Sequence, residues 1–212
     1  MRYLALALAL AALPCPAVAQ VAAVGSTTTP RAIVKPTARI TGRVALLVDS
    51  SGSMGHGRDA RALRAALLIA GQPTDELAVR ITCWSDRYEV WEGHEPTTPQ
   101  WTDLPSADAI VAAGAWIASH APGGGTDPRA ALEDALRQRV KGLSVVLITD
   151  GEWSAELDAA GVVEDLQAWR CEQGLGRAVV AVYGVGPTTS TCAALIELGT
   201  LGGGGLWADA LR

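Results

Sequence analysis

Oxygen-bearing side chains follow apolar runs at three separate places in the sequence. Asp49 opens the sequence Asp-Ser-Ser-Gly-Ser, which adds hydroxyl groups at Ser51 and Ser53. Thr126 follows a glycine-rich stretch, and Asp150 follows a second apolar run. Carboxylate and hydroxyl oxygens are hard ligands that suit Mg²⁺ or Mn²⁺ in octahedral geometry. The pattern predicts a divalent-cation site formed by Asp49, Ser51, Ser53, Thr126 and Asp150.

The charges in this residue set leave room for one further ligand. Asp49 and Asp150 together carry about as much negative charge as a divalent ion carries positive charge, and the hydroxyl groups are neutral. If the carboxylates act partly through water, one coordination position stays open. We therefore expect the bound ion to accept one more oxygen from outside the chain.

Alternating strands and helices must bring these residues together. Residues 43–48 and 143–149 are continuous apolar runs, which are typical of strands buried on both faces. Shorter strands are expected at 77–84, 88–91, 178–183 and 206–208. Helical spacing or capping residues predict helices at 58–70, 106–120, 128–141, 160–173 and 191–199. The glycine run 202–205 is interpreted as a loop before the last strand.

This order of elements predicts an α/β fold. We expect a doubly wound, mostly parallel six-stranded sheet with helices on both faces, and residues 88–91 as an antiparallel edge strand. In such sheets ligands bind beyond the carboxyl ends of strands, where the strand order reverses. That point lies between the strands 43–48 and 143–149, so Asp49 and Asp150 should share one rim.

The spacing Asp49-x-Ser51-x-Ser53, followed by Thr126 and then by Thr149-Asp150-Gly151, resembles the metal-ion-dependent adhesion site of von Willebrand factor type A domains. The resemblance covers residues 41–212 and implies a Rossmann-like fold. It also implies that the hydroxyls of Ser51, Ser53 and Thr126 contact the metal, while Asp49 and Asp150 commonly act through water.

Two further expectations come from this resemblance. Members of the family mostly bind proteins, and an acidic group of the partner completes the metal shell. Many also have a helix after the last strand, whereas only residues 209–212 follow the last expected strand here. A short or missing final helix is therefore expected.

Four residues near the expected metal loops are candidates for a ligand-binding rim. These are His56, Asp127, Glu152 and Trp153. An exposed Trp153 would be a plausible anchor for a protein partner. Burial of Trp153 under a neighbouring loop is an equally good interpretation of the sequence.

The first 19 residues have the anatomy of a secretory signal peptide. Arg2 gives a positive start, residues 4–13 are an unbroken Leu/Ala run, and Ala17-Val18-Ala19 precedes the expected cleavage point. Residues 20–40 form a Thr/Pro-rich arm or linker, and residues 41–212 form the domain. We therefore expect a secreted or periplasmic protein with no transmembrane segment after cleavage, because the apolar run is too short to span a bilayer.

The net charge and the cysteine spacing argue against a nucleic-acid partner and against a zinc site. Lys and Arg number 17 against 22 Asp and Glu, a net charge of −5, so the chain lacks the basic footprint of a nucleic-acid-binding protein. Cys83, Cys171 and Cys192 have no zinc-ligand spacing. A disulfide between Cys171 and Cys192 is one hypothesis, and Cys83 is expected to be a buried free thiol.

The sequence favours an exported, divalent-metal-dependent protein-binding module that is not an enzyme, with a partner that presents Asp or Glu. The alternative is a metal-dependent hydrolase or phosphatase that uses the same carboxylates. That chemistry needs a general acid or base above the metal, and only Glu152, Asp127 and His56 are near enough in sequence. A metal with a purely structural role is a third reading.

Overall fold

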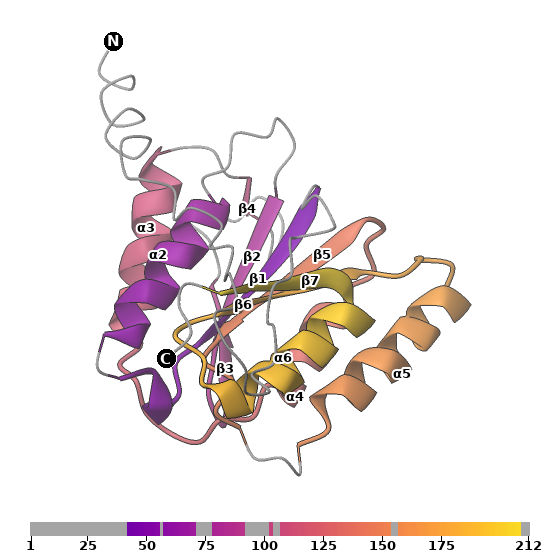
Figure 1. Ribbon diagram of the computed structural model, residues 1–212. Coiled ribbons are helices and arrows are strands. Elements are labelled where there is room, and N and C mark those ends of the chain that lie inside the picture. The colour runs from indigo at the N-terminus through magenta and orange to yellow at the C-terminus, as the bar shows by residue number, and fades with distance from the viewer. Residues whose placement is uncertain are drawn as a thin grey trace.

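The computed structural model describes residues 42–55, 57–70, 78–91, 102–103, 107–153 and 157–208. Strands and helices alternate through most of this part of the chain (Figure 1). The strands are β1 Arg43–Asp49, β2 Ala78–Trp84, β3 Tyr88–Val90, β4 Thr102–Asp103, β5 Leu143–Thr149, β6 Val179–Gly184 and β7 Gly203–Ala208. The helices are the 3-10 helix η1 Gly52–Met54, α2 Arg58–Ala70, α3 Ala107–Ser119, α4 Arg129–Leu136, α5 Ala159–Glu172 and α6 Thr189–Leu201.

The strands form one sheet in the order β3-β2-β1-β5-β6-β7. The pairs from β2 to β7 are parallel, and β3 pairs antiparallel with β2. This confirms the predicted doubly wound six-stranded sheet with an antiparallel edge, and the neighbouring position of β1 and β5. The two-residue strand β4, which pairs antiparallel with β2, was not predicted.

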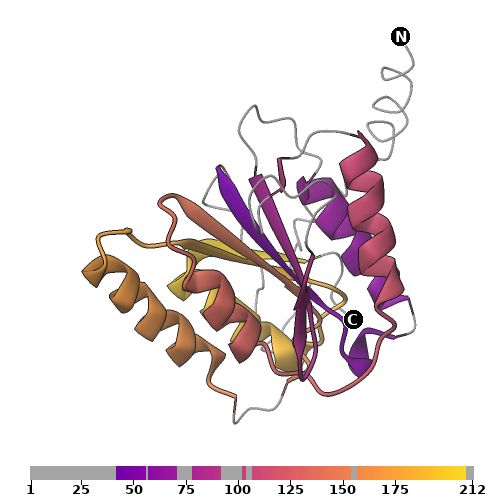
Figure 2. The ribbon, with the colours of Figure 1, turned by 180° about the vertical axis from the view of Figure 1, so that it is seen from behind.

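Helices cover both faces of the sheet (Figures 1 and 2). Helices α2 and α3 pack on one face against alternate residues of β1, which are Val44, Leu46 and Val48. Helices α4, α5 and α6 pack on the other face, which receives Ala45 and Leu47 of β1. Because β1 is buried from both sides, its sequence is a continuous apolar run rather than an alternating one.

Strand β5 is buried along its whole length, as β1 is from its second residue onward. Because the core holds both strands in place, the polar loops that follow them start from fixed positions at the end of each strand.

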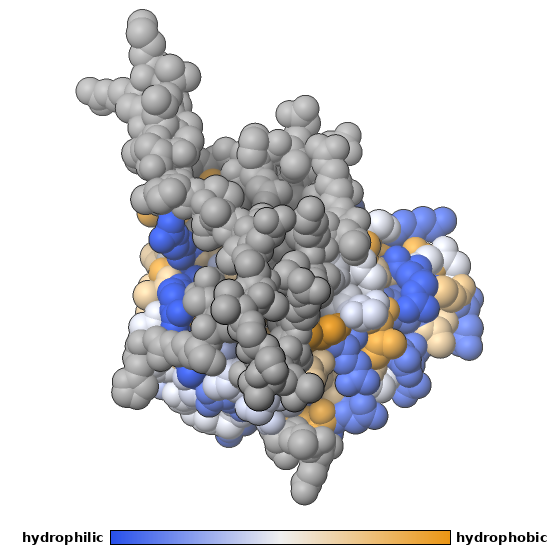
Figure 3. All heavy atoms as spheres, in the orientation of Figure 1, coloured by the Kyte–Doolittle hydropathy of each residue, from blue (hydrophilic) through white to orange (hydrophobic). Residues whose placement is uncertain are grey.

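The outer surface is different in character: over α5 in Figure 3 the side chains are mainly hydrophilic, with hydrophobic ones scattered between them. Within the described residues, no helix has the length and apolar character needed to cross a membrane.

The bounds of helices α4 and α6 differ most from the prediction. Helix α4 ends at Leu136 rather than near residue 141, because the buried Arg170 guanidinium binds the carbonyl oxygens of Leu136, Gln138 and Val140. Helix α6 begins at Thr189 rather than after Thr191.

The start of α6 is fixed by a capping box. Thr188 is the N-cap residue, and its hydroxyl accepts the backbone N–H of Thr191. The hydroxyl of Thr191 in turn accepts the N–H of Thr188. Thr191 is therefore a member of the cap at the third helical position, and the cap lies three residues earlier than predicted.

The glycine run was interpreted wrongly as a loop, because β7 already begins at Gly203. The reason is the close approach of β7 and α6 to β6. A Cβ atom on Gly202 would lie 2.3 Å from the Val180 side chain, and one on Gly204 would lie 2.5 Å from the Val180 carbonyl oxygen. Only glycine allows these backbones to pack so closely.

The proposed disulfide is also wrong, because Cys171 and Cys192 are both free thiols. Cys171 is exposed at the end of α5, whereas Cys192 is buried in the first turns of α6. Cys83 is a buried free thiol, as predicted, and burial raises the pKa of its thiol to about 12. The leader 1–19, the arm 20–40, His56 and the expected chain end 209–212 lie outside the described residues.

Candidate metal centre

Asp49 ends β1 and is almost fully buried, with 2% of its surface exposed. Its Oδ1 accepts the backbone N–H of Ser51 at 2.8 Å, and its Oδ2 accepts the hydroxyl of Thr149 at 2.6 Å. The parallel register of β1 and β5 explains the second bond, because Val48 pairs with Ile148 and the next residues are Asp49 and Thr149. The carboxylate is thus held in one orientation.

The two serines lie in the turn that follows Asp49. The hydroxyls of Ser51 and Ser53 are 3.0 Å apart, and the Ser53 hydroxyl donates to Oδ1 of Asp150 at 3.3 Å. The 3-10 helix η1 sets this geometry, since the N–H of Met54 donates to the Ser51 carbonyl at 3.0 Å. The Met54 side chain is fully buried and anchors the turn to the core. Both serine hydroxyls therefore lie between the two strand ends.

Asp150 follows β5 and is fully buried. Its Oδ1 also accepts the N–H of Glu152 at 2.9 Å, so the turn after β5 folds around the carboxylate. Gly151 makes this turn with φ +76°, and a Cβ atom there would lie 3.0 Å from the Leu195 side chain. A side chain at this position would strain the turn that orients Asp150.

Backbone hydrogen bonds bring the loop with Thr126 to the same rim. The N–H of Gly123 donates to the Ser50 carbonyl at 2.9 Å, and the N–H of Asp127 donates to the Ser85 carbonyl at 3.1 Å. Thr126 lies between these two anchors and is partly buried. Among the described residues, none forms a hydrogen bond with the Thr126 hydroxyl, which leaves its oxygen available to a ligand.

Arg58, in the first turn of α2, was not among the predicted site residues. Its Nη1 donates to Oδ2 of Asp150 at 2.6 Å, to Oε1 of Glu152 at 2.9 Å and to the carbonyl of Ser53 at 3.0 Å. A helical side chain leans toward the N-terminus of its helix, here toward the turn that contains Ser53. The basic residue in the first turn of the helix that follows Ser53 was therefore a feature of the sequence from which this contact could have been predicted.

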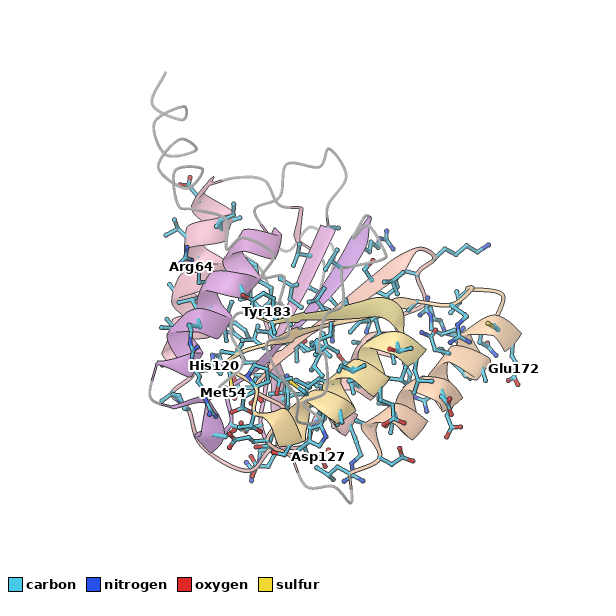
Figure 4. The ribbon with its side chains drawn as sticks, in the orientation of Figure 1. Met54, Arg64, His120, Asp127, Glu172 and Tyr183 are labelled. Carbon is cyan, nitrogen blue, oxygen red and sulfur yellow. The ribbon has the colours of Figure 1, made fainter. Side chains whose placement is uncertain are left out.

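The predicted rim residues lie in different surroundings. Asp127 forms an ion pair with Arg129, and this hydrogen-bonded guanidinium lowers the pKa of the Asp127 carboxyl. Glu152 is exposed and bonds to Arg58, whereas Trp153 is partly buried against the core under α4, α5 and α6. Figure 4 shows the labelled Met54 and Asp127 at the same end of the sheet, away from Glu172 at the end of α5.

The electrostatics of the site centre on Asp49. Burial raises the pKa of its carboxyl from 3.8 to about 6, although the hydrogen bonds from Ser51 and Thr149 act in the opposite direction. The neighbouring charge of Asp150 adds a smaller upward contribution. A cation bound beside Asp49 would offset this cost of burying a negative charge.

The oxygen atoms fit a small, hard cation. Two adjacent ligands of an octahedral ion at about 2.1 Å lie about 3.0 Å apart. The Ser51–Ser53 and Ser53–Asp150 oxygen distances are 3.0 and 3.3 Å. Within the described residues, no three His, Cys, Asp or Glu side chains gather into a metal-binding group. A cation here would therefore depend on hydroxyl ligands, which favours Mg²⁺ or Mn²⁺ over softer metals.

Comparison with known families identifies the kind of domain that this fold represents. The profile of the von Willebrand factor type A domain matches residues 42–206. The chain therefore belongs to the von Willebrand factor type A domain family. Proteins of this family are generally non-enzymatic modules that mediate metal-dependent interactions with other proteins.

Solved structures share the fold at low sequence identity. An aerotolerance-related membrane protein from Bacteroides fragilis is 19% identical with a TM-score of 0.55, over 80% of this chain and 92% of that one. The protein BatB from Bacteroides thetaiotaomicron is 16% identical with a TM-score of 0.56, over 81% and 92%. These similarities establish the fold alone.

A third structure contains a metal. Proximal thread matrix protein 1 from the mussel byssus, in a form with a zinc-occupied MIDAS motif, is 18% identical with a TM-score of 0.50. The match covers 80% of this chain and 41% of the mussel protein. Comparison with curated proteins gave no significant match.

Proposed function

We propose that this domain binds Mg²⁺ or Mn²⁺ through Asp49, Ser51, Ser53, Thr126 and Asp150, and binds a partner protein through that ion. The observation that carries the proposal is the continuous series of oxygen atoms from Ser51 through Ser53 to Asp150, at spacings of 3.0 and 3.3 Å. Hydrogen bonds and metal coordination need similar oxygen spacings here, so an ion can replace these bonds with little movement of the chain.

The partner group that suits this site is a carboxylate. The neutral hydroxyl ligands leave the charge of the ion to be balanced by Asp49 and Asp150 alone, so the ion remains able to bind another anionic oxygen. An Asp or Glu side chain of a partner protein supplies such an oxygen. The helix α4, which begins at Arg129 close to Thr126, adds a weak positive field at its N-terminus, worth about 0.3–1 kcal/mol.

Calorimetric titration with Mn²⁺ tests the metal site. We expect wild-type protein to bind one Mn²⁺ per chain and Asp49→Ala to bind none. Ser50→Ala is the matched control, because Ser50 lies between Asp49 and Ser51 in the chain but its hydroxyl donates to the Trp84 carbonyl at 3.0 Å and not to a proposed ligand. Equal Mn²⁺ affinity in wild type and Asp49→Ala would overturn the site.

Affinity capture with the immobilised domain tests the role of the ion. A partner that is retained with Mg²⁺, released by EDTA and not retained by Asp49→Ala supports metal-dependent protein binding. Retention that EDTA does not affect would contradict it. In the same preparation, metal-dependent turnover of a phosphoester that Asp49→Ala loses would favour the hydrolase alternative instead.

Export is part of the proposal and rests on residues 1–19. The positive start, the Leu/Ala run and the small residues at 17 and 19 fit a secretory signal. We expect mature protein from the native host to begin at Gln20 and to be found in the periplasm or outside the cell. N-terminal sequencing decides this, and an intact Met1 in native protein would refute it.

A further inference from the structure

A positively charged side chain of the domain already binds the proposed metal site. One nitrogen of Arg58, Nη1, donates to Asp150 Oδ2 at 2.6 Å, to Glu152 Oε1 at 2.9 Å and to the Ser53 carbonyl at 3.0 Å. Two of these three oxygens belong to residues of the proposed ligand set. Arg58 thus supplies positive charge at the place where the ion is expected to act.

These contacts complete the hydrogen bonding of Asp150. Its Oδ1 accepts the hydroxyl of Ser53 and the N–H of Glu152, and its Oδ2 accepts Arg58. The carboxylate is fully buried, so it depends strongly on these partners. A divalent ion that approaches Oδ2 therefore meets an oxygen that is already in use, and a guanidinium charge that repels it.

We propose that Arg58 is a built-in competitor of the metal: it holds Asp150 while the site has no ion, and the divalent ion displaces it from Asp150. This inference rests on the proposed metal site and adds how that site is regulated. Metal affinity is then set by an exchange of cations at Asp150 rather than by the ligand oxygens alone.

The surroundings of Arg58 allow such an exchange. Its side chain is 15% exposed, so one side of it faces solvent. Glu152, its second carboxylate partner, is 39% exposed and lies at the outer edge of the site. Arg58 can leave Asp150 and keep its bond to Glu152, which costs less than moving a buried cation into water without a partner.

Substitution of Arg58 separates competition from ordinary structural support. Arg58→Gln removes the charge and keeps a hydrogen-bonding side chain. If Arg58 competes with the ion, this variant binds Mn²⁺ more tightly than wild type, by about tenfold or more. In EDTA the same variant unfolds at a lower temperature than wild type, because the buried Asp150 loses its cation. The two effects have opposite signs, which a purely structural residue would not produce.

The matched control is Arg129→Gln. Arg129 is also close to the site, where it pairs with Asp127 at 2.7 Å, but it forms neither a hydrogen bond nor an ion pair with Asp150. Its removal tests the general effect of one fewer positive charge at the rim. We expect this variant to change Mn²⁺ affinity by less than about threefold, since an exposed charge is screened by solvent.

Calorimetric titration with Mn²⁺ and thermal unfolding in EDTA, on wild type, Arg58→Gln and Arg129→Gln, complete the test. Tighter Mn²⁺ binding by Arg58→Gln alone supports the exchange. Unchanged or weaker binding by Arg58→Gln, with normal binding by wild type, overturns the exchange and leaves the metal site intact. An equal gain in Arg129→Gln also overturns it, in favour of general electrostatics. No Mn²⁺ binding by any of the three proteins overturns the proposed site itself.

Discussion

An arginine side chain lies at each end of the sheet, partly buried at one end and fully buried at the other, and the two bind different kinds of group. At the carboxyl end, Arg58 bonds to the carboxylates of Asp150 and Glu152. At the amino end, Arg170 is fully buried and donates to the backbone carbonyls of Leu136, Gln138, Val140 and Gly176. Arg58 binds two side-chain carboxylates, which a metal cation can also bind, whereas the four bonds of Arg170 all go to the main chain.

This difference distinguishes a candidate ligand-binding site from a set of contacts that only stabilises the fold. Leu136 is the last residue of α4, and Gln138 and Val140 belong to the irregular segment between α4 and β5, whereas Gly176 lies between α5 and β6. Arg170 therefore replaces the missing helical hydrogen bonds at the end of α4. Around Asp49, Ser53 and Asp150 most bonds join side chain to side chain, and these can be exchanged for a ligand without unfolding the backbone.

The largest effect is expected at the amino end. Arg170→Met removes the donor to four carbonyls while it keeps much of the side-chain volume. We expect the free energy of unfolding to fall by about 3–5 kcal/mol, because buried carbonyls lose their partners. Urea denaturation in EDTA measures this change.

Arg177→Met is the matched control for this variant. Arg177 is exposed and donates one bond, to the Leu201 carbonyl at 3.1 Å. Its replacement should change the free energy of unfolding by less than about 0.5 kcal/mol. If the two variants were equally stable, Arg170 would not stabilise the fold through these carbonyls. The contrast drawn between Arg170 and Arg58 would then be wrong.

A smaller effect of opposite sign is expected at Asp49. Its folded-state pKa is about 6 against an ordinary 3.8, so between these pH values the folded protein holds the proton more tightly than the unfolded chain. Without metal, the contribution of Asp49 to stability is therefore full below pH 4 and is lost as the pH rises through 6. The loss amounts to at most about 3 kcal/mol.

Asp49→Asn removes this titration. In EDTA at pH 7 we expect the variant to be more stable than wild type by about 1–3 kcal/mol, and the difference to vanish near pH 4. Urea denaturation at several pH values tests this, and the comparison with wild type cancels the other carboxyl groups. A wild-type advantage at pH 7 would show that the Ser51 and Thr149 bonds outweigh the cost of burying the charge.

Thr126 is expected to have a milder role in the site. Thr126→Ala should weaken Mn²⁺ binding by about three- to tenfold, which is about 1 kcal/mol, because water can replace one neutral hydroxyl. Thr126→Ser keeps the oxygen and should bind Mn²⁺ as wild type does. Calorimetry on both variants checks this, and equal affinities for Thr126→Ala and wild type would remove Thr126 from the ligand set.

The sequence was informative where local pattern decides structure. Continuous apolar runs identified β1 and β5, and the general rule for parallel sheets placed Asp49 and Asp150 on one rim. Tertiary contacts decided the rest. The end of α4 depends on Arg170, 34 residues beyond Leu136, and the strand at Gly203 depends on contact with Val180. Neither partner can be read from the sequence near the element that it determines.

The site was predicted less completely than the sheet for a related reason. The proposed ligand residues follow the spacing of a known motif, so the sequence was enough to name them, but their hydrogen-bond partners follow no such spacing. Thr149 orients Asp49 only because the register of β1 and β5 places the two side by side. Arg58 reaches Asp150 across 92 residues of sequence. A spacing pattern identifies what can bind a cation and does not identify what already competes for it.

The smallest effect is expected beside Arg170. Cys171 follows it on α5, but its thiol is exposed and free. We expect Cys171→Ser to change the free energy of unfolding by less than about 0.5 kcal/mol, since it neither fills the core nor closes a disulfide loop. In native, unreduced protein Cys171 should react quickly with a thiol reagent, while the buried Cys83 and Cys192 react only on unfolding. Mass spectrometry of the labelled protein checks this. A fall of about 3 kcal/mol in the free energy of unfolding of Cys171→Ser, with no labelling of Cys171 or Cys192 in native protein, would indicate a disulfide between them. The stability of the amino end would then depend on that bond as well as on Arg170.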